Sequence, residues 1–150
     1  MRLHRFIHEQ RVALPRDRVF PFFAEARNLE AITPPWLHFR ILSPGEIVMR
    51  RGAVIDYRLR LHGVPFRWQS VIAEWDPPSR FVDLQTRGPY RLWRHEHRFD
   101  QEGGATILRD EVTYAVWGPR FIQRLFVAPS LDRIFAHRRE VIARTFEPRP

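Results

Sequence analysis

Residues 88–99 read GPYRLWRHEHRF and are followed by DQEGG at residues 100–104. Side chains of a β-strand alternate between its two faces, so one face of this stretch is charged. The other face combines two large aromatic side chains with two imidazoles: Trp93, His95, His97 and Phe99. Histidine is only intermediate in its tendency to be buried, so this face is unusual for a plain core. The stretch predicts a strand whose uncharged face lines a pocket.

The composition is typical of one globular domain. The chain has 150 residues, of which 44% are hydrophobic and 13% aromatic. A chain of this length buries roughly 68–70% of its unfolded surface, which suffices for a core and a cavity. We therefore expect a single domain over residues 1–150.

Charge and cysteine content exclude several functions. The net charge is +8, and all 25 residues of the Lys and Arg class are arginine, a pattern that indicates codon bias rather than a binding device. The absence of cysteine excludes disulfides, thiolate metal sites and cysteine nucleophiles. No stretch has the apolar length of a signal peptide or a membrane span, so we expect a cytoplasmic protein without stable membrane insertion.

Hydrophobic periodicity predicts a strand, two short helices, six more strands and a long helix. The first strand covers residues 3–12, and a helix over residues 16–26 is shortened by Pro21. Asn28 is predicted to cap the second helix, which residues 33–35 end. The following strands are predicted at residues 37–42, 53–61, 66–75, 81–87, 92–99 and 106–116.

The last element begins at Pro119 and carries an apolar stripe that includes Phe121, Leu125 and Phe126. Pro129 predicts a kink, with Ser130 capping the second half of the helix. A curved antiparallel sheet must cover its apolar face, and only this helix is long enough to do so. The sequence therefore predicts a sheet that grips a helix.

The two long hairpins predict which side chains share the inner face. Pairing Gln101 with Gly104 puts His95 directly opposite Asp110. This register places an acid beside an imidazole inside the predicted pocket. In the earlier hairpin, Leu61 is paired with Phe66 across a turn at residues 62–65.

Several segments are similar to the helix-grip superfamily, which includes START domains, pollen-allergen-like plant carriers, polyketide cyclases and coenzyme Q-binding proteins. They resemble a bacterial branch of uncharacterised cyclase/dehydrase-like (SRPBCC) proteins across essentially the whole chain. The segments are VFPFF at 19–23, NL at 28–29, TPP at 33–35, FVD at 81–83, GPY at 88–90, WRHEH at 93–97 and DEVTY at 110–114.

This resemblance implies an α+β helix-grip fold, with a curved antiparallel sheet of about seven strands around a long C-terminal helix and two short helices after the first strand. It also implies a cavity between sheet and helix that holds an apolar or aromatic small molecule. Apolarity alone would turn Val82 and Leu84 inward, whereas the resemblance turns Asp83 and Gln85 toward the cavity. We follow the resemblance.

His95 and Asp110 are the candidate catalytic residues. The carboxylate would fix the imidazole tautomer and raise its pKa, so that His95 moves protons on a bound ketone or enol. The alternative is a buried polar pair that orders the sheet. His95 and His97 could also bind a metal with Asp110 or Asp83, but no further ligand cluster supports this reading, and we expect no metal.

The candidate ligand-binding residues form an aromatic wall with polar anchors. Ordinary core packing is an equally good reading of the aromatic residues, and a solvated helix position is the commoner role for an arginine. Arg138 is expected to reach over the cavity mouth and pair with a ligand carboxylate. The full set is Tyr57, Trp68, Asp83, Gln85, Trp93, His97, Phe99, Tyr114 and Arg138.

The preferred function is binding of an apolar or aromatic ligand that is lipid-, polyketide- or quinone-like. The alternative is a cyclase, aromatase or dehydratase that uses His95. A third reading, an anion-binding module, requires arginines gathered on the convex sheet face: Arg58, Arg60, Arg67, Arg94 and Arg98. Asp56 and Glu96 are interspersed among these arginines, so we expect no nucleic-acid partner. No phosphate loop, serine elbow or dinucleotide fingerprint occurs, so we expect no cofactor. We expect a monomer or homodimer.

Overall fold

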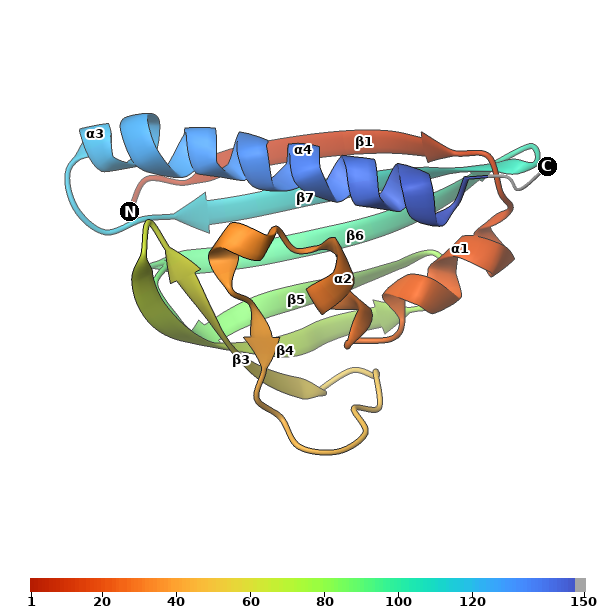
Figure 1. The fold of residues 1–150 in the computed structure, drawn as a ribbon, viewed down its shortest axis with the longest axis horizontal. Helices are drawn as coiled ribbons and strands as arrows, with labels where there is room; N and C mark the ends of the chain where they lie inside the picture. Colours follow the sequence, from red (N-terminus) through yellow and green to blue (C-terminus); the bar gives the residue numbers. More distant parts are fainter. Residues whose placement is uncertain (148–150) are drawn as a thin grey trace.

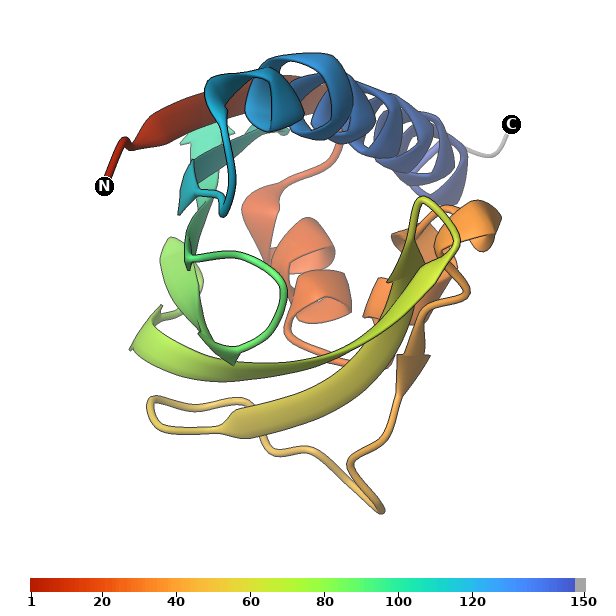
Figure 2. The ribbon, with the colours of Figure 1, turned by 90° about the vertical axis from the view of Figure 1, so that its left-hand side faces the viewer.

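The computed structural model describes residues 1–147 and contains one seven-stranded antiparallel sheet with the strand order β1-β7-β6-β5-β4-β3-β2. The sheet is strongly curved, and the helices lie on its concave side (Figures 1 and 2). The strands are β1 (His4–Val12), β2 (Arg40–Ile41), β3 (Val54–Leu61), β4 (Val64–Asp76), β5 (Arg80–Arg87), β6 (Leu92–Glu102) and β7 (Ala105–Ala115).

The helical elements confirm the predicted helix-grip arrangement. The C-terminal helix α4 runs along the open side of the sheet beside β1 and β7, and α1 and α2 fill the remaining space (Figure 1). The elements are α1 (Arg16–Phe23), α2 (Asn28–Ile32), the 3₁₀ helix η1 (Pro35–Leu37), α3 (Arg120–Ile122), the π-helix η2 (Gln123–Val127) and α4 (Ala128–Thr145). None of the helices in the described part of the chain is long and apolar enough to cross a membrane.

The β6–β7 hairpin turns over Gly103–Gly104, one residue later than predicted, so the strand register differs from the prediction by two residues. Gly103 adopts a φ of 60°, a conformation that favours glycine at a tight turn. His97, rather than His95, therefore lies opposite Asp110. Because a shift of two residues preserves the face of every side chain, His95 and Asp110 still share the concave face as diagonal neighbours.

The β3–β4 hairpin has a shorter turn than predicted. Leu61 pairs with Val64 instead of Phe66, and His62 and Gly63 form the turn with φ values of 51° and 78°. Positive φ at both central residues is the geometry of a two-residue hairpin turn. The shift is again two residues, and Tyr57 and Trp68 become direct partners on the concave face.

Three local predictions are wrong. Asn28 does not cap α2; its side-chain amide donates to the carbonyl of Phe22 (2.8 Å) and so satisfies the end of α1. The predicted strand at residues 37–42 is reduced to Arg40–Ile41, because the prolines at positions 34 and 35 begin a 3₁₀ turn instead. Ser130 does not cap the second half of the final helix, since α4 begins at Ala128 without a side-chain cap.

The final helix departs from its predicted stripe at its beginning. The π-helical turn η2 precedes Pro129 and changes the phase of the helix, because its hydrogen bonds span five residues instead of four. Phe121, Leu125 and Phe126 are exposed, although the predicted stripe included them. Later in the helix, Leu131 and Phe135 are buried as predicted.

The convex face of the sheet carries charged side chains that neutralise one another. Arg80 contacts Glu74, Asp76 and Glu96 at 2.6–3.2 Å. Arg94 reaches Glu74 at 3.2 Å, and Arg98 approaches Glu96 at 3.8 Å. The arginines of this face therefore do not form the uninterrupted basic surface that the third functional reading requires.

Candidate functional site

A cavity of about 170 Å³ lies between the concave face of the sheet and the helices α1, α2 and α4. Apolar and aromatic side chains make up most of its wall, including Tyr57, Trp68, Tyr90, Trp93, Leu131 and Phe135. An apolar protein cavity of about 150 Å³ holds a benzene-sized molecule. The space is therefore sufficient for a small ring-bearing ligand.

The aromatic part of the wall is held in place by contacts among its own side chains. Trp68 stacks on Tyr57 with 5.6 Å between ring centroids and meets Trp93 edge-on at 5.3 Å. The Tyr57 hydroxyl and the Trp68 indole N–H both contact Oγ of Ser70, at 3.2 and 3.0 Å. These bonds satisfy the polar atoms of two rings that otherwise present apolar surface to the cavity.

Tyr90 completes this wall because Gln85 holds the β5–β6 turn. The Gln85 amide donates to the carbonyl of Tyr90 (2.8 Å) and accepts from its backbone N–H (3.1 Å). Gly88 leaves room for this arrangement, since a Cβ there would lie 2.5 Å from Oε1 of Gln85. Gln85 thus positions a cavity residue instead of lining the cavity itself, contrary to its predicted place.

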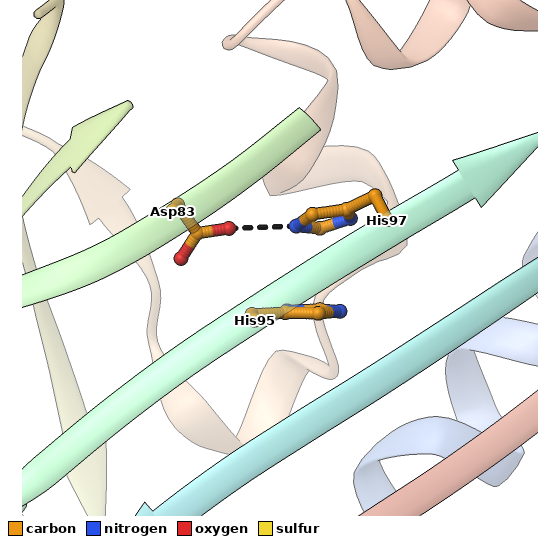
Figure 3. Close-up of side chains that lie close together, drawn as sticks. All are labelled: Asp83, His95 and His97. Carbon is orange, nitrogen blue, oxygen red and sulfur yellow. Dashed lines mark hydrogen bonds and ion pairs between the residues drawn. The ribbon is translucent and has the colours of Figure 1, made fainter. Parts of the chain in front are cut away.

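Two histidine–aspartate pairs lie in and behind the polar part of the wall, and Figure 3 shows the His97–Asp83 pair with His95 beside it. Nε2 of His95 lies 2.8 Å from Oδ1 of Asp110, and Nε2 of His97 lies 2.6 Å from Oδ2 of Asp83. The two imidazole rings stack on each other with centroids 3.6 Å apart. Strands β5, β6 and β7 are adjacent, so the sheet itself brings the four side chains together.

Arg138 joins this cluster from α4. Its guanidinium donates to Oδ1 of Asp110 at 3.3 Å and lies 5.5 Å from the centre of the Phe135 ring. Only 9% of the residue is exposed, and its Nε has no hydrogen-bond partner among the described residues. Arg138 is therefore part of the inner wall and does not reach over the mouth of the cavity as predicted.

The pKa values of this cluster are shifted by burial and by neighbouring charges. Burial, reinforced by His95, outweighs the attraction of Asp83 and lowers the pKa of His97 to about 4. Burial opposes ionisation of Asp110, but Arg138 and His95 together hold the pKa of that carboxyl well below its usual range. Burial also opposes ionisation of Asp83, yet the bond from His97 keeps its pKa lowered.

These shifts fix the hydrogen-bonding roles at neutral pH. An ionised carboxylate only accepts, so Nε2 of each histidine carries the proton that it donates to its aspartate. With Nε2–H of His95 directed at Asp110, Nδ1 is the ring nitrogen left to accept a proton, the arrangement of a carboxylate-oriented base. The second carboxylate oxygen of Asp83 points away from His97 (Figure 3), and 17% of this side chain is exposed although it lines the cavity.

The same atoms are a poor match for a shared metal ion. Donor atoms of Asp83, His95 and His97 lie within 4.8 Å of one another. The two Nε2 atoms, however, bond to different carboxylates, and the rings lie face to face with an interplanar angle of 22°. Two imidazoles that bind one metal must instead direct their nitrogen lone pairs at a common point. The geometry favours two hydrogen-bonded pairs.

The structure places seven of the predicted site residues in the cavity wall: Tyr57, Trp68, Asp83, Trp93, His95, His97 and Arg138. Asp110 lies behind His95 as its hydrogen-bond partner. Phe99 packs in the core against Phe20 and Phe23, with centroids 5.0 and 5.3 Å apart. Tyr114 is buried beside the cavity and accepts a bond from Gln123 (3.0 Å).

Sequence reasoning missed Tyr90 and the contribution of the helices. Leu131 and Phe135 belong to the predicted helical stripe, which identified them as buried but not as cavity residues. Ala26, Leu29 and Ile32 line the cavity from the α2 side, and no periodicity in so short a helix distinguishes such positions from core. The turn sequence GPY at residues 88–90 is the only local signal for Tyr90.

Several solved structures share this fold. The Zhui aromatase/cyclase from Streptomyces sp. R1128 superposes with a TM-score of 0.76 at 18% identity, covering 97% of this chain and 94% of that chain. Ginseng major latex-like protein 151 from Panax ginseng gives 0.70 at 14%, covering 97% and 99%. A START superfamily protein from Mycobacterium smegmatis gives 0.69 at 10%, covering 95% and 99%. These similarities establish a START-like helix-grip fold.

No curated protein matches the chain in sequence. A family match does cover most of it, over residues 11–146, which run from the end of β1 to the end of the C-terminal helix. The chain therefore belongs to the family described as Domain of unknown function (DUF8410).

Proposed function

We propose that residues 1–150 form one small-molecule binding domain whose cavity holds an apolar or aromatic ligand. The observation that carries this proposal is a cavity of about 170 Å³ with an aromatic wall and a buried charged cluster on one side. Such a combination, mostly apolar with a few polar groups, is typical of ligand pockets. The fold shared with an aromatase/cyclase and a START superfamily protein supports it.

The shape and charge of the cavity narrow the class of ligand. Its volume suits about one ring, and a lipid-, polyketide- or quinone-like molecule of several rings requires the helices to move outward. Asp83 presents an acceptor, and the cluster contains two carboxylates but only one guanidinium. A ligand with a hydrogen-bond donor, such as a phenolic hydroxyl, is therefore favoured over one with a carboxylate.

Calorimetric titration with phenol and benzene tests this proposal. Phenol is expected to bind more tightly than benzene because only phenol donates to Asp83. Leu59→Trp, which fills the cavity from β3, is expected to abolish binding of both. Val54→Trp, at an exposed position on the same strand, is the matched control. Absence of heat and of any thermal shift with either probe would refute the proposal.

A second candidate function, proton transfer on a ketone or enol, is favoured by the His95–Asp110 bond of 2.8 Å. This distance is within the reach required of an oriented base. Asp110 would hold Nε2–H while Nδ1 of His95 takes a proton from the carbon beside a bound carbonyl. A cyclase, aromatase or dehydratase needs such a step.

Exchange of the α-protons of cyclohexanone in D₂O, followed by NMR, tests the second function without knowledge of the substrate. Wild-type protein is expected to accelerate exchange, and His95→Gln to lower the rate by roughly 10²-fold or more. Phe99→Leu, in the core outside the cavity, is the control and is expected to retain the acceleration. Equal rates for wild type and His95→Gln would eliminate the base while leaving ligand binding intact.

A further inference from the structure

Four segments of the chain meet at one end of the molecule. Apart from histidine, arginine is the only ionisable basic or acidic residue type with a formal charge in these segments. Residues 1–8, 57–73, 84–95 and 112–131 contain no aspartate or glutamate. The fold brings their ends together around the β7–α3 connection, on the left in Figure 1 and facing the viewer in Figure 2. We call the turn residues 61–64 and 88–91 and the segment 116–127 the arginine end.

Side-chain contacts show that these segments form one surface. The Arg91 guanidinium lies 5.1 Å from the ring centre of Trp117, which joins the β5–β6 turn to the β7–α3 connection. The rings of His62 and Phe126 are 5.8 Å apart, which joins the β3–β4 turn to η2. At the start of β1, His4 pairs with Tyr114 at the end of β7.

Large apolar side chains project from the arginine end. Trp117, Phe121, Leu125 and Phe126 are 45–62% exposed, and Val64 of the neighbouring turn is 52% exposed. Leu125 and Phe126 lie in the π-helical turn η2, none of whose residues is buried. Arg120 and Arg124 are interleaved with these apolar residues and are themselves exposed.

Within the described part of the chain, Arg91, Arg120 and Arg124 of this end lack the acidic partners that arginines of the convex face such as Arg80 and Arg109 have. The ion pairs of the described residues lie either in the cavity cluster or on the convex face, as in Arg80–Glu96 and Arg109–Glu9. Arg91, Arg120 and Arg124 take part in none of them. The positive charge of the arginine end is therefore uncompensated beside its exposed apolar side chains.

We propose that the arginine end docks on the surface of an anionic phospholipid bilayer. Such a surface offers negative headgroups to the arginines and an apolar layer just beneath them to the tryptophan, phenylalanine and leucine side chains. Nucleic acid would neutralise the arginines but leave four large apolar side chains in water. A second copy would bring arginine against arginine. Only the bilayer satisfies both kinds of side chain.

Sedimentation with vesicles of phosphatidylcholine, with and without phosphatidylglycerol, tests this proposal. The protein is expected to sediment with the anionic vesicles and to be released by high salt. Arg120→Gln and Arg124→Gln are each expected to weaken partitioning roughly fivefold. The double variant Leu125→Ser/Phe126→Ser is expected to weaken it by about tenfold or more.

Matched controls come from the rest of the surface. Val48→Ser removes an apolar side chain that is 64% exposed outside the arginine end, and Arg98→Gln removes an arginine of the convex face. Both are expected to partition like wild type, and circular dichroism verifies that every variant is folded. Equal partitioning of the Leu125→Ser/Phe126→Ser variant and wild type would overturn the proposal. So would binding to duplex DNA but not to vesicles, or dimerisation that the same variant abolishes.

Discussion

Five ionisable side chains meet in and behind one wall of the cavity: Asp83, His95, His97, Asp110 and Arg138. Charged groups are costly to bury unless they are paired and hydrogen-bonded. Asp110 has the central place, because it accepts from His95 and from Arg138. The stability of this wall should therefore depend on Asp110 more than on any exposed ion pair.

Replacing Asp110 with asparagine is expected to lower the free energy of unfolding by about 3 kcal/mol or more, because Arg138 is left as a buried unpaired charge. Asparagine retains a hydrogen-bond acceptor for His95, so the decrease in the free energy of unfolding measures the effect of removing the negative charge. Urea denaturation measures it. Glu111→Gln, on the same strand but in the surface pair with Arg5, is the control and should cost less than about 1 kcal/mol. Similar losses in both variants would contradict the assigned pairing.

The lowered pKa of His97 predicts a specific loss of stability in acid. Above pH 6.5 the imidazole is neutral in both the folded and the unfolded chain. As the pH falls toward 4, the unfolded chain binds a proton that folded His97 does not, so the stability decreases by up to about 3 kcal/mol.

Urea denaturation between pH 7 and pH 4 measures this dependence. His97→Gln, which can still donate to Asp83, is expected to show a smaller decrease than wild type. His62→Gln, on the exposed β3–β4 turn, should retain the wild-type decrease. An unchanged pH dependence in His97→Gln would show that His97 binds its proton over the same pH range in the folded and the unfolded chain, which would contradict the lowered pKa.

At the scale of elements, the β5–β6 turn determines whether the aromatic wall is complete. Gln85 makes both hydrogen bonds that hold the backbone of Tyr90. Gln85→Leu is expected to destabilise the fold by about 1–2 kcal/mol and to weaken phenol binding, although residue 85 does not line the cavity. Calorimetry measures the affinity, and Thr86→Val, at the adjacent exposed position, is the control. Unchanged affinity in Gln85→Leu would mean that Tyr90 does not contribute to the site.

The strand faces could be predicted from the sequence, but the turns could not be located to the residue. Alternation correctly placed Trp93, His95 and His97 on the concave face, because the period of a strand is independent of its register. The registers of both hairpins were wrong by two residues, since glycine pairs such as Gly103–Gly104 permit a turn at more than one position. The two-residue error preserved the faces, which is why the His95–Asp110 contact was still predicted.

The sequence did not predict which residues at the start of the last helix face the sheet, nor which helical residues line the cavity. Pro129 indicated an interruption, but the interruption takes the form of a π-helical turn ahead of the proline. Leu125 and Phe126, which lie in this turn, are exposed although their apolar character assigned them to the predicted stripe. Asn28 illustrates the same limit, because its amide satisfies α1 instead of the helix that follows it.

At the scale of the whole molecule, the cavity and the arginine end are close to each other. Leu61 and Tyr90 line the cavity and also belong to the two turns of the arginine end. A ligand that enters or leaves near these turns would do so beside a docked bilayer. Leu59→Trp is expected to abolish ligand binding while leaving vesicle binding unchanged. Leu125→Ser/Phe126→Ser is expected to weaken vesicle binding while leaving ligand binding unchanged. Loss of both properties in either variant would contradict two separate sites.

The central claim is that the cavity holds a ring-bearing ligand with a donor directed at Asp83. A crystal of the protein soaked with 4-bromophenol tests it most directly, because anomalous scattering locates the bromine without ambiguity. The account predicts one bromine inside the cavity near Trp68 and Phe135, with the phenolic oxygen within hydrogen-bond distance of the Asp83 carboxylate. Bromine only on the outer surface, with the cavity empty or closed, would contradict the account.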